Sequence, residues 1–239
     1  ITEYYKQLFG PPEENFVSLD ESRIEDVPQL TAIENDIFSA PFSEKEVFEA
    51  IMQMKHNKAP GPDGFPAEFY QKCWHIIKRD LMPMFHDLFD GHLDLFHLNF
   101  GTITLLPKKV EAIRIEQFRS ICLLNVSFKI FTKVGMNRLT RIAHSVVQPT
   151  QTAFMSGRQI LEGVVVLHET LHEIHTKKLD GVIFKVDFEK AYDKVKWPFL
   201  QQALRMKGFN ESWRSQVDSF IQKGSVGIKV NDDTGHYFM

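Results

Sequence analysis

The chain has 239 residues, 43% of them hydrophobic and 25% charged, so it can bury a sizeable core in one large domain or two small ones. Its formal net charge of -3 excludes nucleic-acid binding through an overall basic field, and any such binding has to come from local patches. Its two cysteines, Cys73 and Cys122, have no cysteine neighbour in the sequence, which indicates a reducing compartment. No apolar run approaches the roughly 18 residues that a membrane helix needs, so we expect an intracellular protein.

The first 42 residues mix acids with prolines and show weak periodicity, which predicts a linker or lead-in segment without chemistry. A capping box formed by Ser43 and Glu46 then opens a short amphipathic helix. This helix ends at residues 58–64, Lys-Ala-Pro-Gly-Pro-Asp-Gly, whose prolines and glycines predict a tight, shaped loop. Such a loop is either functional or a plain connector, and the residues alone favour neither reading.

Helical spacing continues over residues 66–89, and a strand is predicted over 101–109, where threonines alternate with aliphatic residues. Lys108 and Lys109 stand at the end of this strand, and Arg114 and Arg119 follow before the next apolar stretch. Together they predict a hairpin that carries cations. Ammonium and guanidinium groups at such a tip suit a triphosphate, and a solvated loop is the alternative.

A longer helix is predicted over residues 128–146 by apolar residues at three- and four-residue spacing. Its other face is basic, with Lys129, Lys133, Arg138 and Arg141. This face suits a nucleic-acid backbone, although a solvated helix face has the same pattern. An irregular turn over residues 151–158 then adds another exposed cation, Arg158.

The next predicted helix, residues 160–174, contains His168-Glu-Thr-Leu-His172, which fits the H-E-x-x-H pattern of helical zinc sites. A catalytic zinc site needs a third protein ligand. The residues that follow, Lys177, Lys178 and Asp180-Gly181, are poor candidates for it. A zinc hydrolase built on His168 and His172 is therefore a minor alternative.

An apolar run over residues 182–186 follows the turn signal Asp180-Gly181, which predicts a buried strand with Asp187 at its end. Phosphoryl transfer by two metal ions needs carboxylates held on rigid backbone, and a strand end provides such a position. A solvated aspartate at a strand-to-helix turn is the alternative. Helices are then predicted over 197–208 and 211–221, followed by a hairpin that begins at residue 225.

Six sequence blocks in order resemble the reverse transcriptase domain of LINE-type, non-LTR retrotransposons, most closely those of plants. The blocks are Lys58-Ala-Pro-Gly-Pro-Asp-Gly64, Ile103-Thr-Leu-Leu-Pro-Lys108, Phe118-Arg119 with Leu123-Leu-Asn125, Lys129-Ile-Phe-Thr-Lys133 with Asn137-Arg-Leu139, Gln151-Thr-Ala-Phe154 with Gly157-Arg158, and Val186-Asp-Phe-Glu-Lys-Ala-Tyr-Asp193. The resemblance implies an α+β fold, the fingers and a partial palm of a right-hand polymerase. It implies a lead-in over 1–42, fingers and fingers–palm helices over 43–180, and a partial palm over 181–239.

The resemblance also implies roles for individual residues. Asp187 would be the first metal-binding catalytic aspartate, joined on Mg2+ by the carbonyl oxygen of Phe188. Tyr192 would exclude nucleotides with a 2'-hydroxyl, and Lys108 and Arg119 would face the triphosphate of the incoming dNTP. The implied partners are an RNA template and a DNA primer, in the nucleus or cytoplasm.

Two departures from the family pattern stand out. Ser120 and Ser156 occupy positions where the family usually has proline. The distal Gln-Gly-Asp-Pro-type loop and the aromatic-Ala-Asp-Asp hairpin do not occur in the sequence, and Asp232 and Asp233 are instead predicted to lie at a hairpin turn. We therefore expect an RNA-directed DNA polymerase fragment that is inactive alone. A nucleic-acid-binding remnant without chemistry is the alternative.

Overall fold

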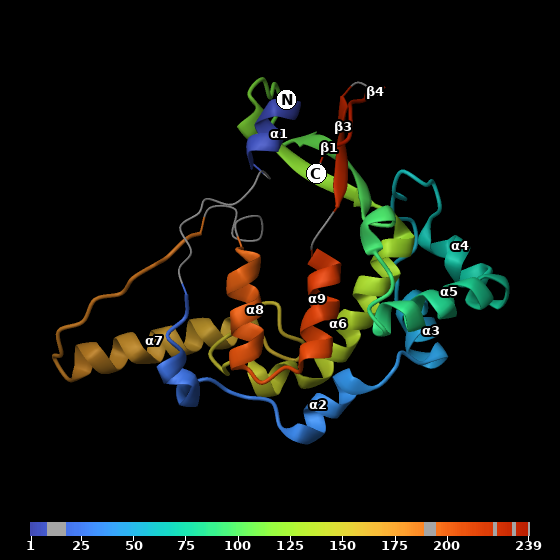
Figure 1. Ribbon diagram of the computed structural model, residues 1–239. Coiled ribbons are helices and arrows are strands. Elements are labelled where there is room, and N and C mark those ends of the chain that lie inside the picture. Colours follow the sequence, from blue (N-terminus) through green and yellow to red (C-terminus); the bar gives the residue numbers. More distant parts are fainter. Residues whose placement is uncertain (9–17, 189–194, 222–223, 231–232, 239) are drawn as a thin grey trace.

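The computed structural model describes residues 1–8, 18–188, 195–221, 224–230 and 233–238. A small sheet stands above a group of helices, and one further helix projects to the side (Figure 1). Both chain termini lie near the sheet. The mixed helix and sheet content confirms the predicted α+β class.

Four helices form what we call the helical body: α3 (Glu44–Met52), α4 (Ala67–Lys72), α5 (Trp74–Phe89) and α6 (Val126–Val146). The predicted capping box begins α3, because the Ser43 hydroxyl accepts a hydrogen bond from Glu46 N while the Glu46 carboxylate accepts one from Ser43 N. The helical rhythm of residues 66–89 is divided between α4 and α5, which meet at Cys73. Phe85 and Phe131 stack at 4.3 Å between their ring centroids in the core of this body.

The described parts of the lead-in segment, residues 1–8 and 18–42, contain more helix than its weak periodicity suggests. They contain α1 (Thr2–Leu8), the 3-10 helix η1 (Glu21–Asp26) and α2 (Ala32–Ser39). Phe38 of α2 is buried, and its ring lies 4.4 Å from that of Trp213 in α9 (Glu211–Ile221). The helix predicted over 197–208 is present as α8 (Trp197–Met206), and it lies beside α9. The contact between Phe38 and Trp213 could not be predicted from the proline-rich local sequence, because it depends on tertiary packing.

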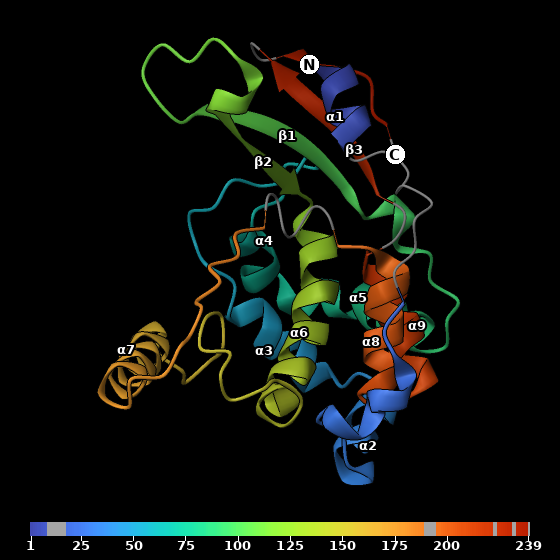
Figure 2. The ribbon, with the colours of Figure 1, turned by 90° about the vertical axis from the view of Figure 1, so that its left-hand side faces the viewer.

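The sheet has the strand order β2-β1-β3-β4. Its strands are β1 (Phe100–Pro107), β2 (Phe118–Leu124), β3 (Ser225–Val230) and β4 (Asp233–Thr234). The predicted β1–β2 hairpin is antiparallel, and the predicted β3–β4 hairpin pairs Val230 with Asp233. The parallel pairing of β3 with β1 was not predicted, because it joins segments far apart in sequence. Figure 2 shows α1 against one face of this sheet, where Tyr5 packs on Ile103 and Ile228. The short 3-10 helix η2 (Leu95–His97) precedes β1, and a second one, η3 (Ile115–Gln117), lies between β1 and β2.

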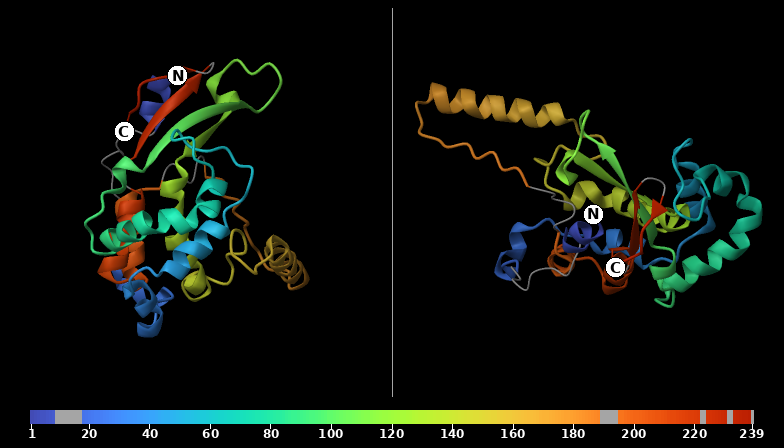
Figure 3. Two further views of the ribbon diagram at one scale, coloured as in Figure 1. Left: turned by 90° about the vertical axis from the view of Figure 1, so that its right-hand side faces the viewer. Right: turned by 90° about the horizontal axis from the view of Figure 1, so that it is seen from above.

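One helix and the extended chain after it stand apart from the rest (Figures 1 and 3), and we call residues 160–188 the arm. The predicted helix is present as α7 (Ile160–Thr176), but none of its residues is buried. The prediction of a buried strand over residues 182–186 is wrong: these residues form no strand, and Phe184 is 85% exposed. A buried strand needs neighbours for its backbone groups and its side chains, and no described strand pairs with this run.

Candidate nucleotide and nucleic-acid interface

The β1–β2 hairpin brings two of the predicted cations together. Arg119 lies opposite Leu106 in the ladder, and Lys108 N donates a hydrogen bond to Gln117 O at 2.8 Å. The Lys108 ammonium donates to Glu116 O at 2.8 Å, which holds its side chain across the hairpin connection. Both side chains are exposed. The hairpin tip therefore offers a guanidinium and an ammonium to an anionic ligand.

Strand alternation places Arg119 on the same face of the sheet as Leu106, Thr104 and Thr102. This face is opposite the one that α1 covers, because Ile103 packs on Tyr5. An open pocket of about 580 Å³ lies over it. Its lining residues are Pro60, Gly61, Pro62, Thr102, Thr104, Leu105, Leu123, Lys229 and Thr234.

The loop at residues 58–64 forms one wall of this pocket, and its shape is fixed by Gly61. A Cβ atom at Gly61 would lie 2.4 Å from Asn125 N and 2.5 Å from the Leu124 carbonyl carbon, so only glycine allows this approach. Asp63 N donates to the Asn125 side-chain oxygen at 3.2 Å, and Phe65 N donates to Asp63 Oδ1 at 3.1 Å. The predicted tight, shaped loop is confirmed, and it is bound to the beginning of α6.

The basic face predicted on α6 is present only in part. Arg141 is exposed, whereas Lys129 and Lys133 are half-buried. Burial lowers the pKa of Lys129, and the nearby Cys122 and Asp63 oppose that change. Lys129 and Lys133 lie one turn apart in the first half of α6, and Arg141 lies about two turns further on.

The structure corrects the expectation for Arg138. Its side chain is only 2% exposed, and its guanidinium donates to both carboxylate oxygens of Glu46, each at 2.9 Å, and to the carbonyl oxygens of Ala40 and Pro41. It also lies 4.1 Å from the centroid of the Phe42 ring. A nucleic-acid backbone cannot reach this group, so Arg138 joins α6 to the segment before α3 instead.

The same contacts shift the titration of Glu46. Burial alone would raise the pKa of this carboxyl, but the hydrogen bonds and charge of Arg138, together with Ser43 N and its hydroxyl, lower it to about 2. Glu46 is therefore ionised wherever the protein is studied near neutral pH. A bidentate arginine–carboxylate pair of this kind fixes geometry as well as charge.

Arg158 also differs from the exposed cation predicted. It is half-buried, and its guanidinium donates to the carbonyl oxygens of Val147 at 3.1 Å, Gln148 at 2.6 Å and Gln151 at 2.7 Å. These bonds close the turn that follows α6. The guanidinium is thus used within the protein.

Asp187 and Phe188 lie at the exposed end of the arm, and Tyr192 lies outside the described residues. The extended chain that carries Asp187 runs along the outside of the molecule, apart from the β1–β2 hairpin (Figures 1 and 2). Within the described part of the chain, no three side chains of His, Cys, Asp or Glu form a cluster that could hold a metal ion. No described carboxylate therefore joins Asp187 in a two-metal site, and His168 and His172 have no described third ligand for zinc.

Comparisons with known proteins relate this chain to reverse transcriptases and to proteins of transposable elements. A family model described as reverse transcriptase (RNA-dependent DNA polymerase) matches residues 106–238. The 149 kDa protein of transposon TX1 from Xenopus laevis is 27% identical over 231 residues, which cover 95% of this chain and 17% of that protein. The Pol polyprotein of retrotransposable element R1 from Bradysia coprophila is 24% identical over 64% of this chain and 15% of its own length.

A third relative is the Pol polyprotein of element R2 from Nasonia vitripennis, which is 25% identical over 82% of this chain and 18% of that polyprotein. The chain therefore spans less than a fifth of the length of these relatives. None of the described helices is both long and apolar enough to cross a membrane.

Proposed function

Because this chain belongs to the reverse transcriptase (RNA-dependent DNA polymerase) family, we propose that it is the template- and nucleotide-binding part of an RNA-directed DNA polymerase domain from a non-LTR retrotransposon. Its substrates would be an RNA template, a DNA primer and dNTPs. The likeness to plant elements stays a prediction. So does the division into a lead-in, fingers and a partial palm at residues 42 and 180.

The observation that carries the proposal is the β1–β2 register, which sets Arg119 opposite Leu106. Lys108 follows Leu106 by two residues in the sequence. Both cations therefore belong to one face of the hairpin tip. A fork-shaped guanidinium and a point charge can hold different oxygens of one triphosphate. Arg141, Lys129 and Lys133 on α6 would contact the backbone of the template.

Reverse transcriptases generally use divalent metal ions such as Mg2+, which stabilise the charge that develops during phosphoryl transfer. No described carboxylate joins Asp187 in such a site, so the described residues support binding of nucleotide and template. Asp187, with the Phe188 carbonyl, is proposed as a metal ligand and Tyr192 as the residue that excludes a 2'-hydroxyl.

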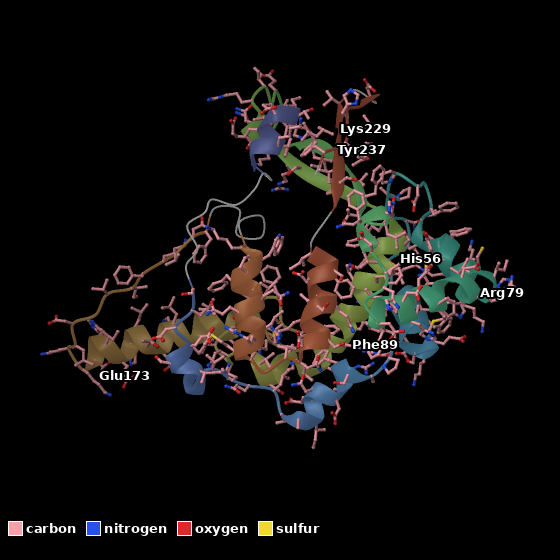
Figure 4. All side chains as sticks on the ribbon, in the orientation of Figure 1. His56, Arg79, Phe89, Glu173, Lys229 and Tyr237 are labelled. Atoms are coloured by element: carbon pink, nitrogen blue, oxygen red, sulfur yellow. The ribbon has the colours of Figure 1, made fainter. Side chains whose placement is uncertain are left out.

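Triphosphate binding by the full chain tests the proposal. We expect Arg119→Ala to weaken dTTP binding roughly tenfold or more, as loss of a charged hydrogen bond does. Arg79→Ala is the matched control, because Arg79 is an exposed arginine on α5, away from the hairpin (Figure 4). Equal dTTP affinity in the Arg119 variant and the wild type would contradict the assignment.

Primer extension separates the polymerase from a remnant that only binds. Incorporation of dTTP on an RNA template that Asp187→Ala abolishes would assign catalysis to this chain. Salt-sensitive template binding without incorporation would support the remnant instead. We expect the second result for the chain alone, because Asp187 has no described carboxylate partner.

A further inference from the structure

The outer edge of β2 is an unpaired strand edge within the described part of the chain. β2 stands at one end of the strand order, so only β1 pairs with it among the described strands (Figure 2). Lys108 N donates to Gln117 O just beyond the ladder, which marks a hydrogen-bonded pair. Because bonded pairs alternate in an antiparallel ladder, the backbone groups of Ser120 and Cys122 point away from β1. An edge of this kind can accept a further strand.

The extended run of the arm, residues 182–188, has the sequence of a strand without a neighbour. It makes no hydrogen bond to another residue. In an extended chain its exposed apolar residues share one face, and they are Val182, Phe184, Val186 and Phe188. Lys185 and Asp187 belong to the other face. This alternation is typical of a strand that is half-buried in a sheet, and exposed apolar groups of this size mark an interaction site.

We propose that residues 182–188 of one copy of the chain add to the outer edge of β2 in a second copy as an antiparallel strand. The two copies exchange these strands reciprocally, which closes a dimer. The register sets Phe184 opposite Cys122 and Asp187 opposite Arg119. The inference goes beyond the proposed function and does not depend on it, because it follows from strand pairing and apolar burial.

The two faces of the sheet determine how the added strand lies. Arg119 belongs to the pocket face, so Ser120 and Cys122 belong to the face that α1 covers. With Phe184 beside Cys122 and Val186 beside Ser120, the apolar face of the arm extends the apolar cluster under α1. A slip by one residue would turn these apolar side chains to the pocket face, so the alternation favours this placement.

Charge and buried area agree with the pairing. The register brings the Asp187 carboxylate beside the Arg119 guanidinium, an opposite-charge pair across two strands. β2 contains no proline and no charged residue other than Arg119, so nothing in its sequence opposes a further strand. Four phenylalanines from two arms would bury roughly 600–1,000 Å². The valines and the edge of β2 add to this area, which approaches the ~1,200 Å² of a stable interface.

Sedimentation equilibrium of the full chain tests the dimer. We expect the wild type to have twice the chain mass of 27.8 kDa. Val186→Pro removes the N–H that faces Ser120, so the dissociation constant of the dimer should rise at least about tenfold. Lys185→Pro is the matched control, because the N–H of residue 185 would point away from β2. Proline is tolerated on the open side of an edge strand, and we expect a change below about threefold.

A disulfide tests the register. Residues of a hydrogen-bonded antiparallel pair have Cα atoms about 5.5 Å apart, which a disulfide can span. Phe184→Cys, oxidised with oxidised glutathione, should form a covalent dimer with Cys122 of the second copy on a non-reducing gel. Adding Cys122→Ser should abolish this product. Lys185→Cys is the control, because its side chain would lie on the face opposite Cys122.

The possible results separate the occupants of the β2 edge. A covalent dimer that needs both cysteines supports the inference. A monomeric wild type, or a dimer that Val186→Pro leaves unchanged, overturns it. A disulfide within one chain also overturns it, because the run then pairs with its own β2, and a ladder of larger covalent products shows open-ended addition instead of a closed pair. Circular dichroism melting of both proline variants checks that the helical body stays folded.

Discussion

The helical body and the arm have similar sequence patterns and opposite environments. Both contain apolar residues at regular spacing, yet Leu88 of α5 is 2% exposed while Leu167 of α7 is 47% exposed. In the body, α3, α5 and α6 pack around Phe85 and Phe131. Periodicity therefore shows which face a segment can bury, whereas burial itself requires a second element of matching shape.

The largest effect is expected where the body is held to the segment before it. Arg138→Ala leaves the Glu46 carboxylate and two carbonyl oxygens without their donor, so we expect a loss of about 3–5 kcal/mol in the free energy of unfolding. Urea denaturation measures it. Arg141→Ala is the control, because Arg141 is exposed and its guanidinium lies 4.0 Å from Glu46 Oε1, and we expect a change within about 0.5 kcal/mol. Equal losses in the two variants would refute the assigned role of Arg138.

The second-largest effect is expected from a cavity created in the helical body by substitution. Leu88→Ala removes a buried side chain from the cluster around Phe85, and we expect the free energy of unfolding to fall by about 2–5 kcal/mol. The denaturant midpoint should shift without a change in slope, since the surface exposed on unfolding stays nearly the same. A loss below 1 kcal/mol, on the order of a surface substitution, would show that this cluster is not packed as described.

The next effect is expected at the loop of residues 58–64, which packs where β2 of the sheet meets α6 of the helical body. Gly61→Ala places a Cβ against the backbone of residues 124 and 125, so the loop has to move, and we expect a loss of about 1–3 kcal/mol in the free energy of unfolding. Gly64→Asn is the control, since asparagine tolerates the left-handed conformation of that residue, at φ +76°, and no atom lies within 4 Å of its Cβ position. Thermal melting of both variants distinguishes a steric clash from a general intolerance of the loop.

A smaller effect on the free energy of unfolding is expected at low pH, where the Glu46 carboxylate becomes protonated. The folded pKa of Glu46 is lowered from 4.5 to about 2, so its contribution is fully present above pH 4.5 and is lost as the pH falls toward 2. After allowance for solvent screening we expect about 1–2 kcal/mol from this group. The difference in unfolding free energy between wild type and Arg138→Ala should shrink by that amount over this pH range. A difference that stays constant from pH 5 to pH 2.5 would contradict the lowered pKa.

Local sequence signals predicted the regular elements well, because their causes are local. The capping box at Ser43 begins α3, and the alternating residues after Gly101 form β1. The β1–β2 hairpin with Lys108 and Arg119 was also predicted, since both cations lie close to one turn. The identification of the polymerase class rested on the order of motifs rather than on any one contact.

Long-range contacts could not be predicted from the same patterns. The pairing of β3 with β1 and the contact between Phe38 and Trp213 depend on chain segments far apart in sequence. Arg138 fits the basic stripe of its helix, and only the tertiary position of Glu46 makes it a buried partner. The pocket over the sheet carried no sequence signal, because threonine is common in strands and one wall of the pocket is built by the loop at residues 60–62.

The smallest effect is expected on the arm, and it is the one that most directly tests the comparison. Leu167→Ala is the same substitution as Leu88→Ala, but Leu167 belongs to a helix with no buried residue, so we expect a change below about 0.5 kcal/mol. Leucine and alanine are both good helix formers, which leaves α7 itself nearly unaffected. Urea denaturation of the two leucine variants side by side measures the contrast. If Leu167→Ala costs as much as Leu88→Ala, the apolar face of α7 is packed in solution, and the arm belongs to the folded core.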